Sequence, residues 1–173
     1  LKARNRVDII AQNAFNAEIP LMIDAEESWI QEAIDEIAHL MMTRYNLERP
    51  IVYNTSQMYR HDRFLYIQNL YKQAEEGDFY VGLKIVRGAY MEKERARAQK
   101  KGYNSPIQPT KAATDVDYDK AIRFCVEKIN RISICAGTHN EKSSLLLTEI
   151  MKENQILEND QRIYFSQLLG MSD

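Results

Sequence analysis

Short apolar segments typical of strands alternate along this chain with longer amphipathic segments typical of helices, and this alternation constrains the fold most strongly. The predicted strands cover residues 20–23, 51–53, 79–87, 132–136 and 162–165. The predicted helices cover residues 7–15, 30–41, 60–76, 91–101, 114–129 and 143–154. A capping box from Thr114 to Asp117 is expected to open the fifth helix. Strands joined in this order through helices form a parallel sheet with right-handed crossovers.

Two parallel architectures fit this alternation: an open doubly wound sheet and a closed (βα)8 barrel. The six glycines form neither G-x-G-x-x-G nor G-x-x-x-x-G-K-[ST], the phosphate-binding loops of Rossmann and P-loop domains. The predicted strands end in polar residues, as barrel strands do at an active site: Asp24, Gln57, His139 and Gln167. The pattern therefore predicts an α/β chain that forms part of a TIM-like barrel, with strands missing at both ends. Leu1, in place of an initiating methionine, leads us to expect a longer parent chain.

Composition and charge exclude several classes of protein. Hydrophobic residues make up 45% and charged residues 28%, which supplies a globular core and excludes a disordered or collagen-like chain. The formal net charge is −2, so we expect no nucleic-acid partner. No apolar run approaches the roughly 20 residues of a membrane helix, and no signal peptide opens the sequence. Cys125 and Cys135 lack the pattern of a zinc site or disulfide framework, which predicts a reducing compartment, and Cys125 is expected to be buried and inert.

The segment 79–88 predicts the strand with the clearest chemical content. Alternate residues of a strand face opposite sides, so Val81, Leu83 and Ile85 are expected to pack under helices while Lys84 points into the barrel. A buried lysine is costly unless a carboxylate or an electron-rich ligand meets it. A salt bridge to a nearby carboxylate and a ligand-facing role both stay open. Gly88 is expected to allow close backbone approach by a ligand.

Carboxylates follow the first predicted strand. We interpret Asp24 as an interior carboxylate that binds an ammonium group or a basic side chain. Glu26 and Glu27 are expected to favour the positive N-terminus of the next helix. A divalent-metal site of Asp24, Glu26 and His139 is an alternative, although one histidine among scattered carboxylates is an unspecific metal signature.

The predicted helix 91–101 is highly charged. Its basic residues lie among Glu92 and Glu94, so we expect a solvated helix face rather than a phosphate site. These basic residues are Arg95, Arg97, Lys100 and Lys101.

Five segments together resemble the proline dehydrogenase family, FAD-dependent enzymes that oxidise L-proline to Δ1-pyrroline-5-carboxylate. The segment from Lys84 to Ala98 is the most specific. The segments are Asp24–Glu27, Asn54–Tyr59, Lys84–Ala98, Thr138–Glu141 and Gln167–Met171. The resemblance is to the stand-alone and mitochondrial branch, because the bifunctional bacterial enzymes typically have arginine at position 84 and lysine at position 87. That exchange keeps both charges but changes the hydrogen-bonding geometry.

The resemblance implies a role for each matched residue. Asp24 corresponds to the active-site aspartate, and Lys84 to the cation beside the flavin, where a positive charge stabilises the reduced ring. Tyr90 and Leu169, or its neighbour Leu168, are implied to line the proline pocket. The implied contacts to FAD are Ala25, Gln57, Lys84, Arg87, Gly88, Ala89, Thr138, His139 and Asn140, with Thr110 and Lys111 near the phosphates. No metal is implied.

The resemblance also implies what lies around this segment. Residues 1–173 would be one piece of the barrel, about strands two to six, without the first strand, the last two strands and the final helix. The paired arginines that clamp the substrate carboxylate would lie outside, so the isolated chain is expected to be inactive or nearly so.

The implied electron acceptor is a quinone, with peripheral membrane association of the complete enzyme. The compartment would be cytoplasmic or membrane-peripheral in a bacterium and mitochondrial in a eukaryote. Two other functions stay open: a divalent-metal barrel hydrolase or lyase, and a non-catalytic remnant. Metal analysis of the purified protein distinguishes the metal enzyme from a proline dehydrogenase, and visible flavin absorbance distinguishes the non-catalytic remnant from it.

Overall fold

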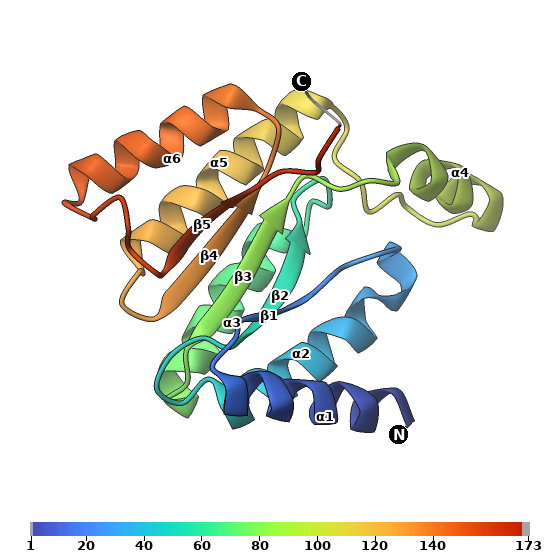
Figure 1. Ribbon diagram of the computed structural model, residues 1–173. Coiled ribbons are helices and arrows are strands. Elements are labelled where there is room, and N and C mark those ends of the chain that lie inside the picture. The colour runs from blue at the N-terminus through green and yellow to red at the C-terminus, as the bar shows by residue number, and fades with distance from the viewer. Residues whose placement is uncertain (1, 171–173) are drawn as a thin grey trace.

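The computed structural model describes residues 2–170 and contains one parallel sheet in the order β1-β2-β3-β4-β5 (Figure 1). The strands are β1 (Leu21–Ile23), β2 (Val52–Gln57), β3 (Val81–Val86), β4 (Ile132–Gly137) and β5 (Ile163–Ser166). The helices are α1 (Lys2–Ala17), α2 (Gln31–Tyr45), α3 (Arg63–Gly77), α4 (Met91–Lys101), α5 (Lys111–Glu127) and α6 (Glu141–Glu153), with a 3-10 turn η1 (Ser28–Ile30) before α2. The predicted alternation of strands and helices is confirmed.

The strand order decides between the two parallel architectures. A doubly wound sheet reverses its strand order at a switch point, whereas these strands follow one another without reversal. Each strand pairs in parallel with the next one along the chain, from β1 with β2 to β4 with β5. The chain therefore has the winding of a barrel, and its five strands form a curled part of one.

Helices α2, α3 and α5 pack on one face of the sheet, and that face forms the core. In β3, Val81, Leu83 and Ile85 are fully buried, as the alternation predicts. The pairing register places Leu83 beside Ile134, which lies in turn beside Ile163, so buried residues share this face across three strands. The aliphatic core lies between sheet and helices, and the opposite face carries the polar and small side chains of the next section.

Glycine on the opposite face makes room for an aromatic ring. A Cβ on Gly82 would lie 2.7 Å from the ring of Tyr53, its partner in the register. The ring of Tyr53 packs edge-on against Tyr164 of β5, with 6.2 Å between their centroids. Rings from β2 and β5 therefore meet across this face.

Helix α5 begins three residues earlier than the sequence predicts. Thr110 has an extended backbone, and its hydroxyl accepts a hydrogen bond from the Ala113 N–H at 3.1 Å, so Thr110 is the N-cap. Thr114 is buried inside the helix, and its N–H donates to the Thr110 carbonyl. The predicted capping box at Thr114 was therefore wrong, because an equally good cap precedes it by one turn.

Within residues 2–170, no helix has both the length and the apolar character needed to cross a membrane.

Candidate active site

Several of the predicted site residues gather at the edge of the sheet where the parallel strands end. Asp24 follows β1, Gln57 ends β2, Lys84 lies in β3, and Thr138 follows β4. Helix α4 lies at this end in Figure 1, and α1 lies at the other end. The register sets Thr55 beside Lys84 and Lys84 beside Cys135, all on the face away from the helices.

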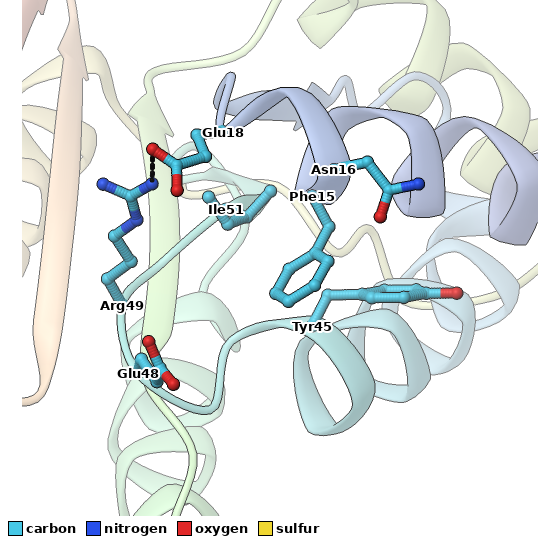
Figure 2. A pocket seen from close by; sticks show the side chains of 7 residues that line it. All are labelled: Phe15, Asn16, Glu18, Tyr45, Glu48, Arg49 and Ile51. Atoms are coloured by element: carbon cyan, nitrogen blue, oxygen red, sulfur yellow. Dashed lines mark ion pairs between the residues drawn. The ribbon is translucent and has the colours of Figure 1, made fainter.

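A separate pocket lies at the opposite end of the molecule (Figure 2). It is about 230 Å³ in volume and lies between α1 and the loop that precedes β2. An ion pair of Arg49 and Glu18, 2.9 Å apart, closes one side. The lining residues are Phe15, Asn16, Glu18, Tyr45, Glu48, Arg49 and Ile51, and none of them belongs to the predicted site.

An ion pair between Lys84 and Asp24 lies at the centre of the edge. The Lys84 Nζ donates to the Asp24 Oδ1 at 2.5 Å. The Thr55 hydroxyl donates to the Ile23 carbonyl at 2.8 Å and lies 3.3 Å from the same carboxylate oxygen, which fixes the end of β1. The salt bridge considered for Lys84 is confirmed. The Asp24 side chain is still 65% exposed and that of Lys84 24%, so both remain accessible to a ligand.

Tyr90 is bound to the segment that follows β1, at a residue two positions after Asp24. Its hydroxyl donates to the Glu26 carboxylate at 2.8 Å, and this hydrogen bond raises the pKa of Tyr90 above its ordinary value. The Gln57 amide donates to the Glu26 carbonyl at 2.6 Å. Glu27 pairs with Lys93 of α4, which lowers the pKa of Glu27. The expectation that both glutamates serve the next helix was therefore wrong, since their side chains bind residues at the start of α4.

Arg87 binds inside the chain with each of its three nitrogens. Nε donates to Asp115 at 2.6 Å, Nη1 to Thr138 at 2.6 Å, and Nη2 to Ser143 at 2.9 Å. The guanidinium also lies 4.2 Å from the ring centre of Tyr118. Arg87 thus joins β3 to α5 and α6, a role that the sequence did not indicate because its partners lie 28 to 56 residues away.

Gly88 has a left-handed backbone with φ of 122°, and an aromatic ring lies beneath it. A Cβ at this position would lie 2.5 Å from the ring of Tyr59. Tyr59 is buried, its N–H donates to the Arg87 carbonyl at 2.7 Å, and burial raises its pKa to about 12. Packing against the Tyr59 ring thus requires glycine at position 88. Gly88 and Ala89 are nevertheless exposed to solvent.

The residues after β4 make several hydrogen bonds within the chain. The Thr138 hydroxyl accepts from the Asn140 N–H at 3.0 Å, and the Asn140 side chain caps α6 by accepting from the Ser143 N–H. His139 accepts at Nε2 from the Leu168 N–H, 3.2 Å away. Its Nδ1 is buried and has no partner among residues 2–170.

Several predicted residues do not join this group. Thr110 caps α5, and Lys111 is exposed at the start of that helix. Leu169 is fully exposed at 103% and Leu168 at 66%, so neither lines an enclosed pocket within the described residues. Ala25 is half-buried beside Asp24. Met171, the end of the last matched segment, lies outside the described residues.

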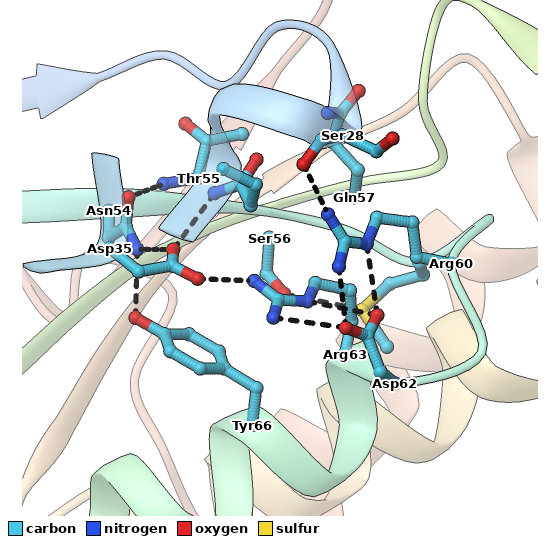
Figure 3. Close-up of polar contacts among 12 residues, drawn as sticks. Ser28, Asp35, Asn54, Thr55, Ser56, Gln57, Arg60, Asp62, Arg63 and Tyr66 are labelled. Atoms are coloured by element: carbon cyan, nitrogen blue, oxygen red, sulfur yellow. Dashed lines mark hydrogen bonds and ion pairs between the residues drawn. The ribbon is translucent and has the colours of Figure 1, made fainter. Parts of the chain in front are cut away.

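A buried polar network supports β2 from the helix side (Figure 3). Asp35 accepts from Asn54 at 2.7 Å and from Arg63 at 2.7 Å. Arg60 pairs with Asp62 at 2.6 Å and also donates to the Ser28 carbonyl at 3.2 Å. Sequence analysis missed this network. No sequence signal indicated it, because the predicted strand ended at residue 53, whereas β2 runs to Gln57 and is buried along its whole length.

The charged helix α4 is only partly a solvated face. Lys100 and Lys101 are exposed, as expected. Arg95, in contrast, donates to the Gln108 carbonyl at 2.9 Å, and Arg97 lies 4.0 Å from the ring centre of Trp29. The prediction was wrong for these two arginines because the segments before α2 and α5 fold against them.

Among residues 2–170, no three histidine, cysteine or acidic side chains come together as a metal site would require. The structure gives no support to the proposed metal ligands Asp24, Glu26 and His139.

The fold and this edge define a class: α/β proteins of barrel winding with polar groups at the carboxyl ends of their strands. A family model described as proline dehydrogenase matches residues 1–173, and the chain belongs to that family. It is 37% identical to proline dehydrogenase 1, mitochondrial, of Drosophila melanogaster and 34% identical to that of Homo sapiens. Each match covers 97% of this chain but only 26% and 28% of those proteins, so the chain spans about a quarter of their length.

Solved structures agree on the fold. Proline utilization A (PutA) from Bdellovibrio bacteriovorus, inactivated by N-propargylglycine, superposes with a TM-score of 0.89 at 19% identity. The match covers 98% of this chain and 18% of that one.

Proposed function

We propose that this chain forms the central part of an FAD-dependent proline dehydrogenase, which oxidises L-proline to Δ1-pyrroline-5-carboxylate. The observation that carries this proposal is the Lys84–Asp24 ion pair, at the carboxyl ends of two parallel strands and open on the face away from the helices. The membership of the chain in the family supports it.

The groups at the edge fit the binding of FAD. After its bond to Asp24, the Lys84 ammonium keeps further N–H donors, and the buried Nδ1 of His139 has no partner within residues 2–170. The backbone of Gly88 and Ala89 is exposed beside them. Lys84, His139, Gln57, Ala25 and the Gly88–Ala89 turn would hold the cofactor. FAD, when bound, supplies the acceptor for a hydride from the proline carbon next to nitrogen.

Each open side chain has a separate task toward the substrate. The Asp24 carboxylate stays accessible beside Lys84 and would bind the proline ammonium through its opposite charge. Lys84 supplies a fixed positive charge beside that site, and its bond to Asp24 orients both groups. Tyr90 offers an aromatic wall whose hydroxyl is held by Glu26.

Arg87, Thr138 and Asn140 contribute by placement, since their polar groups bind one another and α6. Thr110 and Lys111, at the start of α5, remain our candidates for the phosphate end of FAD, and Leu169 remains the candidate for the apolar side of the proline ring.

The finer points belong to the same proposal. The five strands would be strands two to six of an eight-stranded barrel. A quinone would be the final electron acceptor, with peripheral membrane association of the complete enzyme. The compartment would be mitochondrial in a eukaryote, and cytoplasmic or membrane-peripheral in a bacterium.

A visible absorption spectrum of the chain with added FAD tests the proposal. We expect a bound-flavin spectrum that Lys84→Met weakens, and little bleaching with L-proline in the isolated chain. A chain that melts cooperatively but retains no flavin would contradict the proposed cofactor site. The complete enzyme provides the substrate test: its flavin is expected to bleach with L-proline, and a flavin that L-proline leaves oxidised would contradict the proposed substrate.

A further inference from the structure

Glu94 is a buried carboxylate in the charged helix α4. Its side chain is inaccessible to solvent, with 0% exposure. Oε1 accepts from the Ser28 N–H at 2.6 Å, and Oε2 accepts from the Ser28 hydroxyl at 2.5 Å. A buried carboxylate is costly unless such donors satisfy it, so these two short bonds are what allows Glu94 to be buried here.

The two bonds cap a helix from a distance. Ser28 begins η1, which continues directly into α2, and neither Glu27 nor Ile30 provides a side-chain cap. The first N–H groups of a helix need acceptors, and negative charge is favourable at this end. Glu94 supplies both from a position 66 residues further along the chain. It performs the function that the sequence suggested for Glu26 and Glu27.

The contact extends along one face of α4. Four residues at helical spacing, which we call the 90–97 stripe, meet four consecutive residues of the segment before α2. The pairs are Tyr90 with Glu26, Lys93 with Glu27, Glu94 with Ser28, and Arg97 with Trp29. Of these four stripe residues, only Glu94 is fully buried. Exposed pairs contribute little to stability, so the buried member dominates the attachment.

We propose that Glu94 is a positioning residue for the substrate pocket. By capping α2 from α4, it holds the segment 24–30 against the 90–97 stripe and so keeps Asp24 and Glu26 next to Lys84 and Tyr90. The expected effect of Glu94 on proline binding rests on the function proposed above. The capping of α2 by Glu94 rests only on the contacts within this chain.

Trp29 reports directly on the attachment, because it is the only tryptophan of the sequence and follows Ser28. Trp29 is 41% exposed, and its ring lies under Arg97. In Glu94→Ala we expect red-shifted Trp29 emission and stronger acrylamide quenching in the folded chain. Glu94→Gln is expected to restore much of the wild-type signal, since Oε1 can still accept from the Ser28 N–H while Nε2 donates to its hydroxyl.

Two variants keep this test decisive. Glu92→Ala changes an exposed carboxylate of the same helix turn and is expected to leave Trp29 unchanged. Ser28→Ala removes only the hydroxyl bond, so it probes the same contact if Glu94→Ala does not fold. Emission and quenching identical to wild type in folded Glu94→Ala or, failing that, in Ser28→Ala would overturn the capping role.

The second readout is L-proline oxidation by the complete FAD-loaded enzyme. We expect Glu94→Ala to raise KM for L-proline about tenfold, the equivalent of a lost cap of roughly 1.4 kcal/mol. Glu94 touches no reacting atom, so kcat is expected to change less than about twofold. A changed Trp29 signal with unchanged KM would overturn the positioning role. If the complete wild-type enzyme does not oxidise L-proline, the proposed function is contradicted, and so is the expected effect of Glu94 on KM. The Trp29 measurements would still test whether Glu94 caps α2.

Discussion

Asn46 provides the sharpest test of how the base of the sheet is held together. Its side chain is fully buried after α2 and makes four hydrogen bonds to backbone groups. Nδ2 donates to the carbonyls of Val52 at 2.8 Å and Tyr80 at 3.0 Å. Oδ1 accepts from the N–H groups of Ile51 at 2.9 Å and Val52 at 2.8 Å. The side-chain amide of Asn46 thus links the backbone at the start of β2 to the backbone just before β3.

Asn46→Ala leaves these four backbone groups without their partner. Each hydrogen bond contributes roughly 1 kcal/mol net, so we expect the free energy of unfolding to fall by about 4 kcal/mol. A domain of this size is typically stable by about 5–15 kcal/mol, so the loss is a large share of the total. Asn46→Asp keeps the acceptor but turns a carboxylate toward two carbonyls, and should also destabilise the chain.

Urea unfolding followed by far-ultraviolet circular dichroism measures the effect, as a fall in the midpoint at unchanged slope. Asn69→Ala, on the exposed side of α3, is the matched control and should stay within about 0.5 kcal/mol of wild type. If Asn46→Ala lost less than about 1 kcal/mol, water or a shifted backbone would be replacing the amide, and the reasoning would be refuted.

Three further substitutions test the site and its surroundings. Gly88→Ala should destabilise the chain by about 1–3 kcal/mol in the same urea assay, because the position has positive φ and a ring lies beneath it, whereas Ala89→Ser next to it should not. Lys84→Met should weaken FAD binding in a fluorescence titration, while Lys100→Met, at an exposed position of α4, should leave it unchanged. If both variants bound FAD as tightly as wild type, Lys84 would not belong to the cofactor site. Hydrogen bonds from Tyr45 and Arg44 lower the pKa of Asp8 in the folded chain, so its stabilising contribution is present above pH 4 and lost as the pH falls through that lowered value. The melting temperature of Asp8→Asn should therefore fall less steeply than that of wild type below pH 4, and parallel curves would contradict this linkage.

Much of the fold could be predicted from the sequence because its signals are local. The alternation of Val81, Leu83 and Ile85 with polar neighbours depends only on the geometry of a strand, and all three are buried in the structure. Asp24 and Lys84 could be singled out for a related reason, since each is a charge in or next to an apolar strand. The helix stripes likewise follow from spacing within one element.

The partners of polar side chains could not be predicted in this way. Arg87 meets Asp115, Thr138 and Ser143, which approach it only when α5 and α6 dock on the sheet. Glu94 similarly appears in the sequence as one charge of many, although it is the only acidic residue of α4 without solvent exposure. Spacing within a helix cannot distinguish it from Glu92, because the distinguishing contact comes from another part of the chain.

This difference changes how the most specific matched segment, Lys84 to Ala98, is interpreted. Lys84 and the Gly88–Ala89 turn remain open to a ligand, whereas Arg87 and Glu94 have their polar groups engaged within the protein. The segment therefore contains two kinds of group. Some are open to the proposed cofactor and substrate, and others hold those open groups in place. A substitution of the second kind should alter affinity through geometry while leaving the charge of the site intact. Comparing Glu94→Ala with Lys84→Met in one FAD and proline titration would separate the two, because only Lys84→Met removes a positive charge from the site.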